Sequence, residues 1–374
     1  MKRHSVRLEL FLSWVCLVTA GATSAESQES TFNNIWRFAT WYDNDTAPVV
    51  QTVLFSGRFQ YEYASVDDGK ASHDEWNVRR MRLGIRTGLL QRLTLHVEAD
   101  FNPQERDPLY KRLTDTYLQW SFGPRLATTL GKQSVPFTVD GSTSSKELLT
   151  VARSNLANNI WFPQEYVPGV SFSGSGSGWS YRVGAYSAGG RNGEFGEFDG
   201  SFFTLASLGY DFGGQLEADQ VLVRGSYVYQ SPDVNNTFTG QLQHVASLNF
   251  LLAYNRWGIR SDASTAAGYM AQSNLWGTML MPYLNVTSAL QLVSRFTYLD
   301  SDGPNGVRLA RYENQLVDGR GDQYSELYLG ANYFFYGHKL KFQGGLQIAE
   351  MKDSMDDGGS YSGVALTSGL RMSW

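Results

Sequence analysis

Residues 93–101 read Leu-Thr-Leu-His-Val-Glu-Ala-Asp-Phe, and apolar side chains alternate strictly with polar ones along this stretch. A period of two is that of a β-strand whose two faces meet different surroundings. The same alternation recurs in residues 290–298, 340–348 and 361–374. A tilted strand that crosses a bilayer needs about 9–11 residues, whereas strands of soluble sheets average about 5–6. The pattern therefore predicts strands that span a membrane.

Such segments recur from residue 50 to the C-terminus, separated by clusters of Gly, Asp, Asn, Pro and Ser. We count about sixteen, and an even number is what a closed antiparallel bacterial barrel requires. Closure also leaves no strand edge unpaired. We therefore expect an all-β protein in which residues 50–374 form a closed antiparallel transmembrane β-barrel of about sixteen strands. The predicted strands are residues 50–65, 77–90, 92–102, 113–122, 126–137, 168–175, 179–187, 202–212, 220–230, 243–254, 257–268, 274–286, 289–300, 323–335, 338–351 and 361–374.

The first 25 residues have the three parts of a secretory signal peptide: a basic start, an apolar segment at residues 8–20, and small residues that end at Ala25. We expect export and cleavage after Ala25, which would place the barrel in a bacterial outer membrane, surrounded by lipid. Residues 26–49 follow as an N-terminal extension. It could be a plug-like tail, a periplasmic extension or an extra partial strand.

Enzymatic chemistry has little support in the sequence. Cys16 is the only cysteine and falls within the predicted signal peptide, so the mature chain would have no disulfide and no catalytic thiol. The histidines are scattered without metal-ligand spacing, and no G-x-S-x-G motif occurs. The net charge of −5 argues against a nucleic-acid partner. We therefore expect no enzyme activity, no cofactor and no nucleic-acid binding.

The connection at residues 142–163 differs from the other connections. Ser144 and Glu147 have the spacing of a capping box, and apolar residues follow at helical spacing. We expect this loop to carry a short helix and to fold into the lumen, with an external loop as the alternative. The remaining long connections, such as residues 102–111 and 300–321, are expected to be external loops.

Residues 76–90 contain the candidate binding groups. Arg80, Arg82 and Arg86 share one face of the predicted strand, and the apolar residues share the other. An arginine on the lipid face at mid-depth costs about 2–4 kcal/mol, so the arginines are expected to face the lumen, about 6.6–7 Å apart. Arg79 has the opposite parity and is expected near a rim of the barrel.

Other predicted strands also place cations on their polar faces. Guanidinium groups bind oxyanions through paired hydrogen bonds and keep their charge, and tracks of Arg and Lys are typical of anion pores. The alternative is that these arginines pair with lumen carboxylates. The cations are Arg182, Arg224, Arg295, Lys341 and Arg371, and the candidate carboxylates are Glu98, Asp100, Asp115 and Glu326.

Several stretches resemble the phosphate-selective porin O and P family. They are Val78-Arg-Arg-Met-Arg-Leu-Gly, His96-Val-Glu-Ala-Asp-Phe101 with Asp115-Thr-Tyr-Leu118, Leu130-Gly-Lys-Gln-Ser-Val-Pro-Phe137, and the Ser-rich residues 142–145. The sharp motifs lie between about residues 76 and 165. The chain departs from the family pattern in its acidic balance and in lacking a dense lysine cluster near the mature N-terminus.

The resemblance implies a sixteen-stranded homotrimeric porin whose third loop folds inward, with an arginine ladder that leads to a constriction. Arg80, Arg82 and Arg86 would belong to the ladder. Lys132 would lie beside the constriction, with Lys146 and Arg153 contributed by the loop.

These observations predict an outer-membrane porin for passive diffusion of small inorganic anions, and the resemblance adds phosphate and polyphosphate as candidates. Two alternatives remain: a general or cation-preferring porin, and a non-conducting structural or adhesive barrel. The chain ends in an amphipathic strand with an aromatic residue, Trp374. We expect the outer-membrane barrel-assembly machinery to recognise that strand.

Overall fold

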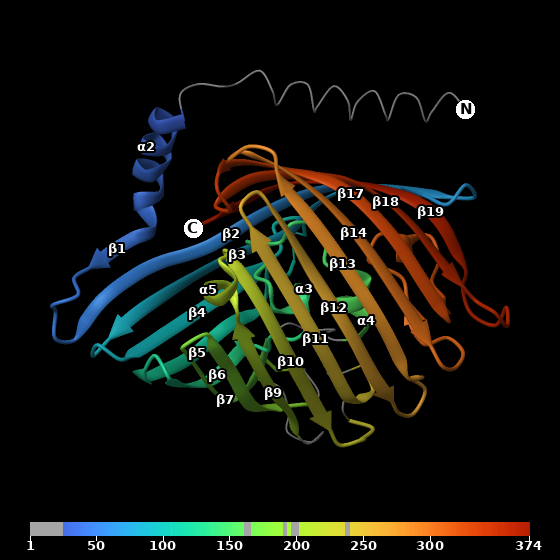
Figure 1. Ribbon diagram of the computed structural model, residues 1–374, viewed down its shortest axis with the longest axis horizontal. Coiled ribbons are helices and arrows are strands. Elements are labelled where there is room, and N and C mark those ends of the chain that lie inside the picture. The colour runs from blue at the N-terminus through green and yellow to red at the C-terminus, as the bar shows by residue number, and fades with distance from the viewer. Residues whose placement is uncertain (1–24, 106, 161–165, 190–192, 196–201, 236–239) are drawn as a thin grey trace.

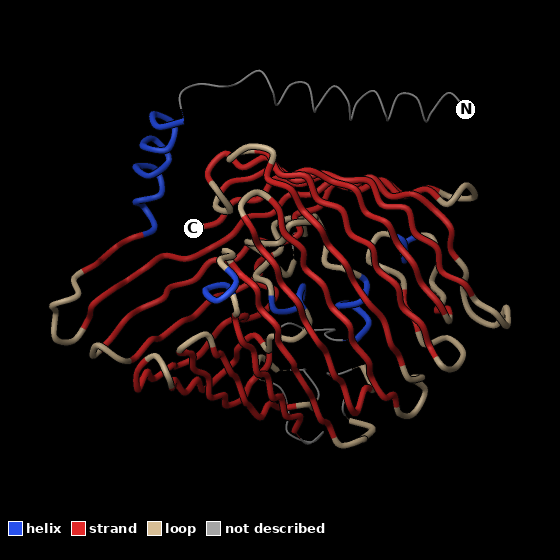
Figure 2. The backbone as a smooth tube through the Cα atoms, viewed as in Figure 1, coloured by secondary structure: helices blue, strands red, loops and turns tan. Residues whose placement is uncertain are grey.

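The computed structural model describes the chain except for residues 1–24, 106, 161–165, 190–192, 196–201 and 236–239. Within the described residues, sixteen strands form one closed antiparallel barrel (Figures 1 and 2). Each strand of the wall pairs with the next one along the chain, and the last pairs with the first to close the ring. The predicted fold class is confirmed. The predicted signal peptide lies, up to residue 24, outside the described residues.

The strands of the wall each overlap one of the predicted segments. They are β2 (Val50–Asp67), β3 (Ser72–Leu89), β4 (Leu93–Phe101), β5 (Tyr110–Gly123), β6 (Leu126–Ser134), β7 (Tyr166–Gly176), β8 (Trp179–Ser187), β9 (Phe202–Asp211), β10 (Gln220–Gln230), β11 (Leu242–Tyr254), β12 (Trp257–Gly268), β13 (Leu275–Asn285), β14 (Leu290–Ser301), β17 (Gln323–Tyr336), β18 (Leu340–Lys352) and β19 (Tyr361–Ser373).

The two faces of the wall differ as the alternation predicts. On β4, Leu95 and Val97 are exposed on the outside, while Glu98 and Asp100 are buried on the inside. Arg82 of β3 lies directly opposite Asp100. A slip of one residue between these strands would turn charged groups toward lipid, so the hydrophobic pattern fixes the register. Among the described residues, no helix is both long and apolar enough to cross a bilayer.

The segment before the wall contains α2 (Ala25–Trp36), the 3-10 helix η1 (Arg37–Ala39) and β1 (Thr40–Asp43). β1 pairs with β2 at residues 52–54, whereas β19 pairs with β2 only from Arg58 onward. β1 therefore covers the part of the β2 edge that β19 does not reach. Trp36 holds the segment against β19: its Nε1 donates a hydrogen bond to the carbonyl oxygen of Ser373, 2.7 Å away. Of the three roles open for residues 26–49, an extra partial strand is present.

Two long connections contain short elements of their own. The loop between β6 and β7 contains α3 (Val139–Ser142) and α4 (Asn155–Ile160), and α4 packs against β12, β13 and β14. The loop between β14 and β17 contains β15 (Val307–Arg308), the 3-10 helix η2 (Glu313–Gln315) and β16 (Arg320–Gly321). A last short helix, α5 (Gly213–Leu216), lies in the turn between β9 and β10.

The hydrophobic core lies where these two loops pack against the inner wall. Leu156 and Ile160 of the first loop and Val307 of the second are completely buried in one cluster. The prediction of an external loop at residues 300–321 is therefore wrong. Its apolar residues, Val307, Leu309 and Tyr312, are buried among the apolar residues of the first loop and the wall rather than left exposed to water.

Candidate functional site

Residues 138–160 cross the barrel interior, and side chains of the wall hold their backbone. Irregular backbone cannot satisfy its own carbonyl groups, so each needs a donor from elsewhere. The inward-facing side chains of five strands supply them. The donors are Gln60 to the carbonyl of Ser145 (3.0 Å), Lys341 and Gln343 to Leu148 (2.6 and 2.9 Å), Asn332 to Leu149 (2.9 Å), Arg371 to Val151 (2.6 Å) and Arg295 to Ala152 (2.8 Å).

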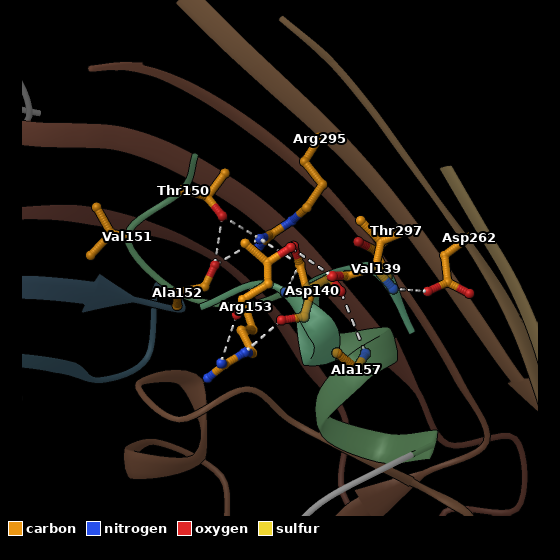
Figure 3. Close-up of polar contacts among 12 residues, drawn as sticks. Val139, Asp140, Thr150, Val151, Ala152, Arg153, Ala157, Asp262, Arg295 and Thr297 are labelled. Carbon is orange, nitrogen blue, oxygen red and sulfur yellow. Dashed lines mark hydrogen bonds and ion pairs between the residues drawn. The ribbon is translucent and has the colours of Figure 1, made fainter. Parts of the chain in front are cut away.

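Arg295 is the centre of this anchoring (Figure 3). Its guanidinium donates to the Thr150 hydroxyl at 2.9 Å and to the Ala152 carbonyl, and it pairs with Glu326 at 2.7 Å. Asp140 of α3 lies 3.9 Å from the same guanidinium. The side chains of Arg295, Thr150, Asp140 and Glu326 are buried, and removing one partner of a buried ion pair typically costs about 3–5 kcal/mol. Arg295 of β14 therefore contributes strongly to the position of the loop, together with the other donors of the wall.

The capping box predicted at Ser144 and Glu147 begins no helix. The amide of Glu147 donates to the carbonyl of Ser144 at 2.8 Å, which closes a single turn. Residues 148–152 are irregular because their carbonyls accept from the wall instead of from amides four residues later. The helix that follows these residues in the loop, α4, begins only at Asn155. Its predicted tail at residues 161–163 lies outside the described residues.

The second loop rests on the first. Asn155 and Asn159 donate to the carbonyl of Arg308 at 2.8 and 3.0 Å, and the amide of Arg308 donates to Asn159 at 2.8 Å. The hydroxyl of Tyr312 donates to Glu62 on β2, 2.6 Å away. The two loops thus pack together inside the barrel.

A cavity of about 330 Å³ remains between the two loops and the inner wall. Its lining contains eight cationic and three carboxylate side chains. The cations are Arg79, Arg80, Arg82, Lys111, Arg112, Arg153, Arg295 and Arg311, and the carboxylates are Glu62, Asp100 and Glu313. We call this space the outer cavity, since it lies toward the end of the barrel that carries the long loops. Within the described residues, no cluster of His, Cys, Asp and Glu is arranged to hold a metal ion.

Arg79 faces this cavity because the strand is irregular there. Gln60 of β2 pairs with Arg80, but the next residue, Tyr61, pairs with Val78. The extra residue is a β-bulge, which reverses the alternation at one point. Arg79 and Arg80 therefore both line the cavity. The expectation that Arg79 lies near a rim with outward parity is wrong, because simple alternation cannot anticipate a bulge.

The predicted site residues are divided among several places. Arg80, Arg82, Arg153 and Arg295 line the outer cavity, whereas Arg182 and Arg224 line a second cavity. Arg86 continues the inward face of β3, opposite His96, but lines neither of these two cavities.

The two predicted lysines have protein partners. Lys132 pairs with Glu194 at 2.9 Å. Lys146 donates to the backbone oxygen of Trp374 at 3.0 Å. In this arrangement, both are engaged with the protein itself.

Lumen carboxylates partly neutralise the arginines, as the alternative interpretation proposed. Arg82 approaches Asp100 at 3.4 Å and stacks on the ring of Tyr166, while Arg295 pairs with Glu326. Two further ion pairs join Arg58 to Glu98 at 3.3 Å and Arg371 to Glu62 at 2.5 Å. Three of the four candidate carboxylates, Glu98, Asp100 and Glu326, thus take part in ion pairs.

Sequence reasoning did not identify several charged residues of the site. Arg58 has the same parity as Gln60 and Glu62 on β2, so the alternation could have found it. Lys111 and Arg112 lie at the start of β5, before residue 113, where the predicted strand begins. Arg311 could not be found, because nothing in a connection of this length indicates that it folds inward.

The second loop is expected to be held more firmly at acid than at alkaline pH. Glu313 accepts from Gln347 at 2.5 Å and from the amide of Ala310 at 3.0 Å. Burial, with the Glu326 carboxylate nearby, raises the pKa of Glu313 from an ordinary 4.5 to about 7. Docking is therefore favoured fully below about pH 4.5, and this contribution is lost as the pH rises through about 7.

Single-channel current in planar bilayers measures this effect. We expect more frequent current fluctuations above about pH 8 than at about pH 5. The variant Glu313→Gln cannot ionise, so the difference should disappear. An unchanged pH response in that variant would show that another group controls the loop.

A closed sixteen-stranded barrel with a polar interior is the architecture of a porin, a channel of the bacterial outer membrane. The family model of the phosphate-selective porin O and P family matches residues 53–267, which is more than half of the chain. The chain belongs to this family. The family and the fold are those of channels and not of enzymes. No curated protein sequence matches the chain.

Solved structures of porins share the fold. The anion-selective porin from Comamonas acidovorans has a TM-score of 0.62 at 13% identity, covering 86% of this chain and 99% of that one. OmpF of Salmonella typhi, in complex with daunomycin, has a TM-score of 0.63 at 11% identity, with coverages of 90% and 100%. The channel DcaP of Acinetobacter baumannii has a TM-score of 0.54 at 14% identity, with coverages of 86% and 97%. At these identities the similarity establishes the barrel fold.

Proposed function

We propose that this porin is a passive channel for small inorganic anions. The observation that carries the proposal is the charge of the outer cavity, where eight cationic side chains face three carboxylates. Seven of the eight cations are arginines, which keep their charge at any physiological pH. Low-dielectric walls focus such a field and raise the local concentration of counter-ions. An anion entering from the long-loop end would meet this excess where the two loops pack against the inner wall.

The ion pairs do not remove this excess. Arg82 and Arg295 are compensated by Asp100 and Glu326, but Arg112 lies 3.9 Å from the same Asp100 that Arg82 uses. Arg311 lies 3.7 Å from Glu75 and is partly exposed. One carboxylate shared between two guanidiniums leaves a net positive charge. The wall and loops therefore favour anions even where single pairs form.

Phosphate and polyphosphate are the substrates that the name of the family suggests. Guanidinium groups match phosphate oxygens through paired, charge-assisted hydrogen bonds, and Arg79 and Arg80 project into the cavity from adjacent positions. Inhibition of chloride current by inorganic phosphate tests this specificity separately from anion preference.

Three further features belong to the same proposal. The chain is exported with cleavage after Ala25, the barrel-assembly machinery recognises β19, and the porin assembles as a homotrimer whose outward apolar face meets lipid and neighbouring subunits. Large apolar side chains such as Leu292 and Phe296 are exposed on that face, as lipid contact requires. The mass of the mature protein and of its detergent-solubilised assembly measures the first and third features.

Recording from purified protein in planar bilayers under a KCl gradient tests the proposal. We expect steady conductance with a preference for chloride. Conductance with a preference for potassium would favour the general porin. Absence of conductance would favour the structural or adhesive barrel.

A further inference from the structure

A second cavity of about 460 Å³ lies on the opposite side of the first loop from the outer cavity, toward the end of the barrel with the short turns. It is lined by Pro124 of the turn after β5, by Ser175 at the end of β7, and by residues at the start of the first loop, including Thr138 and Ser142. We call it the inner cavity. Unlike the outer cavity, its lining contains no carboxylate among the described residues.

Two arginines, Arg182 on β8 and Arg224 on β10, line the inner cavity. The pairing register places them close together across β9, because Arg182 lies opposite Ser207 and Arg224 lies opposite Gly209, two residues further along. Both arginines line the same cavity, and Gly209 between them has no side chain. Two guanidiniums in one cavity repel each other, and an anion bound between them would relieve that repulsion.

Neither arginine has a carboxylate partner within the described part of the chain. Arg182 donates to the carbonyl of Ser134 at 3.3 Å, which is a neutral acceptor. Arg224 is half-buried and lines the same cavity as Arg182. Elsewhere in the lumen, Arg58, Arg82, Arg295 and Arg371 each have a carboxylate nearby. The inner pair therefore lacks the compensation that these four arginines have.

Hydroxyl groups complete the lining. Ser180, Ser207 and Ser226 come from the wall around the two arginines, and Ser226 donates to Ser207 at 3.0 Å. Hydroxyls can rotate to donate to an oxygen atom, and guanidiniums offer paired donors in a fixed plane. Both suit the several oxygen atoms of a tetrahedral oxyanion better than a spherical halide.

We propose that the inner cavity is a binding site for a phosphate-like oxyanion, held between Arg182 and Arg224 after it has passed the loop. The site rests on the proposed anion channel and adds a second position of different selectivity. The outer cavity attracts anions in general through an excess of charge. The inner cavity retains those with several oxygen acceptors.

The test uses the full-length porin in planar bilayers, with inorganic phosphate titrated into a chloride solution. The measured quantity is the phosphate concentration that halves the chloride current. In Arg182→Gln/Arg224→Gln we expect this concentration to rise at least about tenfold, which corresponds to about 1.4 kcal/mol. The matched control is Arg260→Gln. Arg260 faces the lumen near the same end, two residues from the buried Asp262, but does not line the cavity.

The outcomes separate this site from the channel function. A half-blocking concentration that stays within twofold of wild type in the double variant would overturn the inner site, as would a wild-type channel that phosphate does not block. The zero-current potential under a KCl gradient, recorded on the same channels, reports the anion preference independently. If the double variant does not fold, Arg182→Gln and Arg224→Gln are measured singly. A rise of at least about threefold is then expected in each, and no rise in either would contradict the proposal.

Discussion

Replacing Arg79, Arg80 and Arg311 by glutamate should invert the ion preference of the channel from chloride to potassium. The outer cavity would then have five cationic and six carboxylate side chains instead of eight and three. Focused fields of this kind change local ion concentrations by about 10–1,000-fold, so a change of sign should alter the permeability ratio by about tenfold or more. The zero-current potential under a KCl gradient measures the change.

A control with the same total charge separates the cavity from the global field. Arg37, Lys70 and Lys339 are exposed residues outside both cavities. Their replacement by glutamate changes the net charge of the protein equally, and we expect the preference for chloride to persist. If the two triple variants gave the same zero-current potential, the cavity lining could not be the source of selectivity.

The variant Arg295→Met should release the first loop and widen the pore. Glu326 would remain buried without its partner, and Thr150 and Ala152 would lose the hydrogen bonds from the guanidinium. Leaving a buried charge without its partner typically costs about 3–5 kcal/mol, and displacement of this part of the loop would relieve that cost by admitting water. We expect the single-channel conductance in molar KCl to rise about two- to threefold, with increased current noise.

Two further variants examine the cause. Arg295→Met/Glu326→Met also removes the carboxylate that pairs with Arg295 at 2.7 Å. Most of the wild-type conductance should return, because buried ion pairs can often be replaced by apolar residues at little cost. Arg260→Met is the control, because it removes a lumen arginine that has no hydrogen bond or ion pair to the described residues of the loop. Wild-type conductance and noise in Arg295→Met would show that Arg295 does not hold the loop.

The barrel could be predicted from sequence because one physical constraint acts on every strand. Lipid on one side and water on the other impose a period of two, and segments such as residues 93–101 show it without interruption. The orientation of Arg80, Arg82 and Arg295 toward the lumen follows from the same constraint. An arginine at these positions with the opposite parity would face lipid.

The alternation of lipid-facing and water-facing residues does not predict the path of irregular backbone. Arg79 faces the lumen because of a bulge opposite Gln60, and a bulge shifts the period without any residue type that marks it. The second inward loop depends on contacts between distant residues, such as Tyr312 with Glu62 and Asn159 with Arg308. Helical spacing at residues 148–152 was misleading because wall side chains compete for the carbonyls.

The position of a residue in the alternation also predicts which face of the wall its side chain lies on, but not which side chain it pairs with. Arg82 and Asp100 were assigned to the same face, yet their pairing depends on the register between β3 and β4. Arg182 and Arg224 were assigned to the same lumen as the ladder, but the first loop separates their cavity from the outer one. Selectivity is therefore a property of how the loops divide the lumen.

The zero-current potential of the wild-type channel under a KCl gradient tests most directly whether the excess of cations in the outer cavity selects anions. Chloride moving down its gradient faster than potassium makes the dilute side negative, and this is the sign that we expect. A dilute side that becomes positive, or a potential of zero, would contradict anion selection by these arginines.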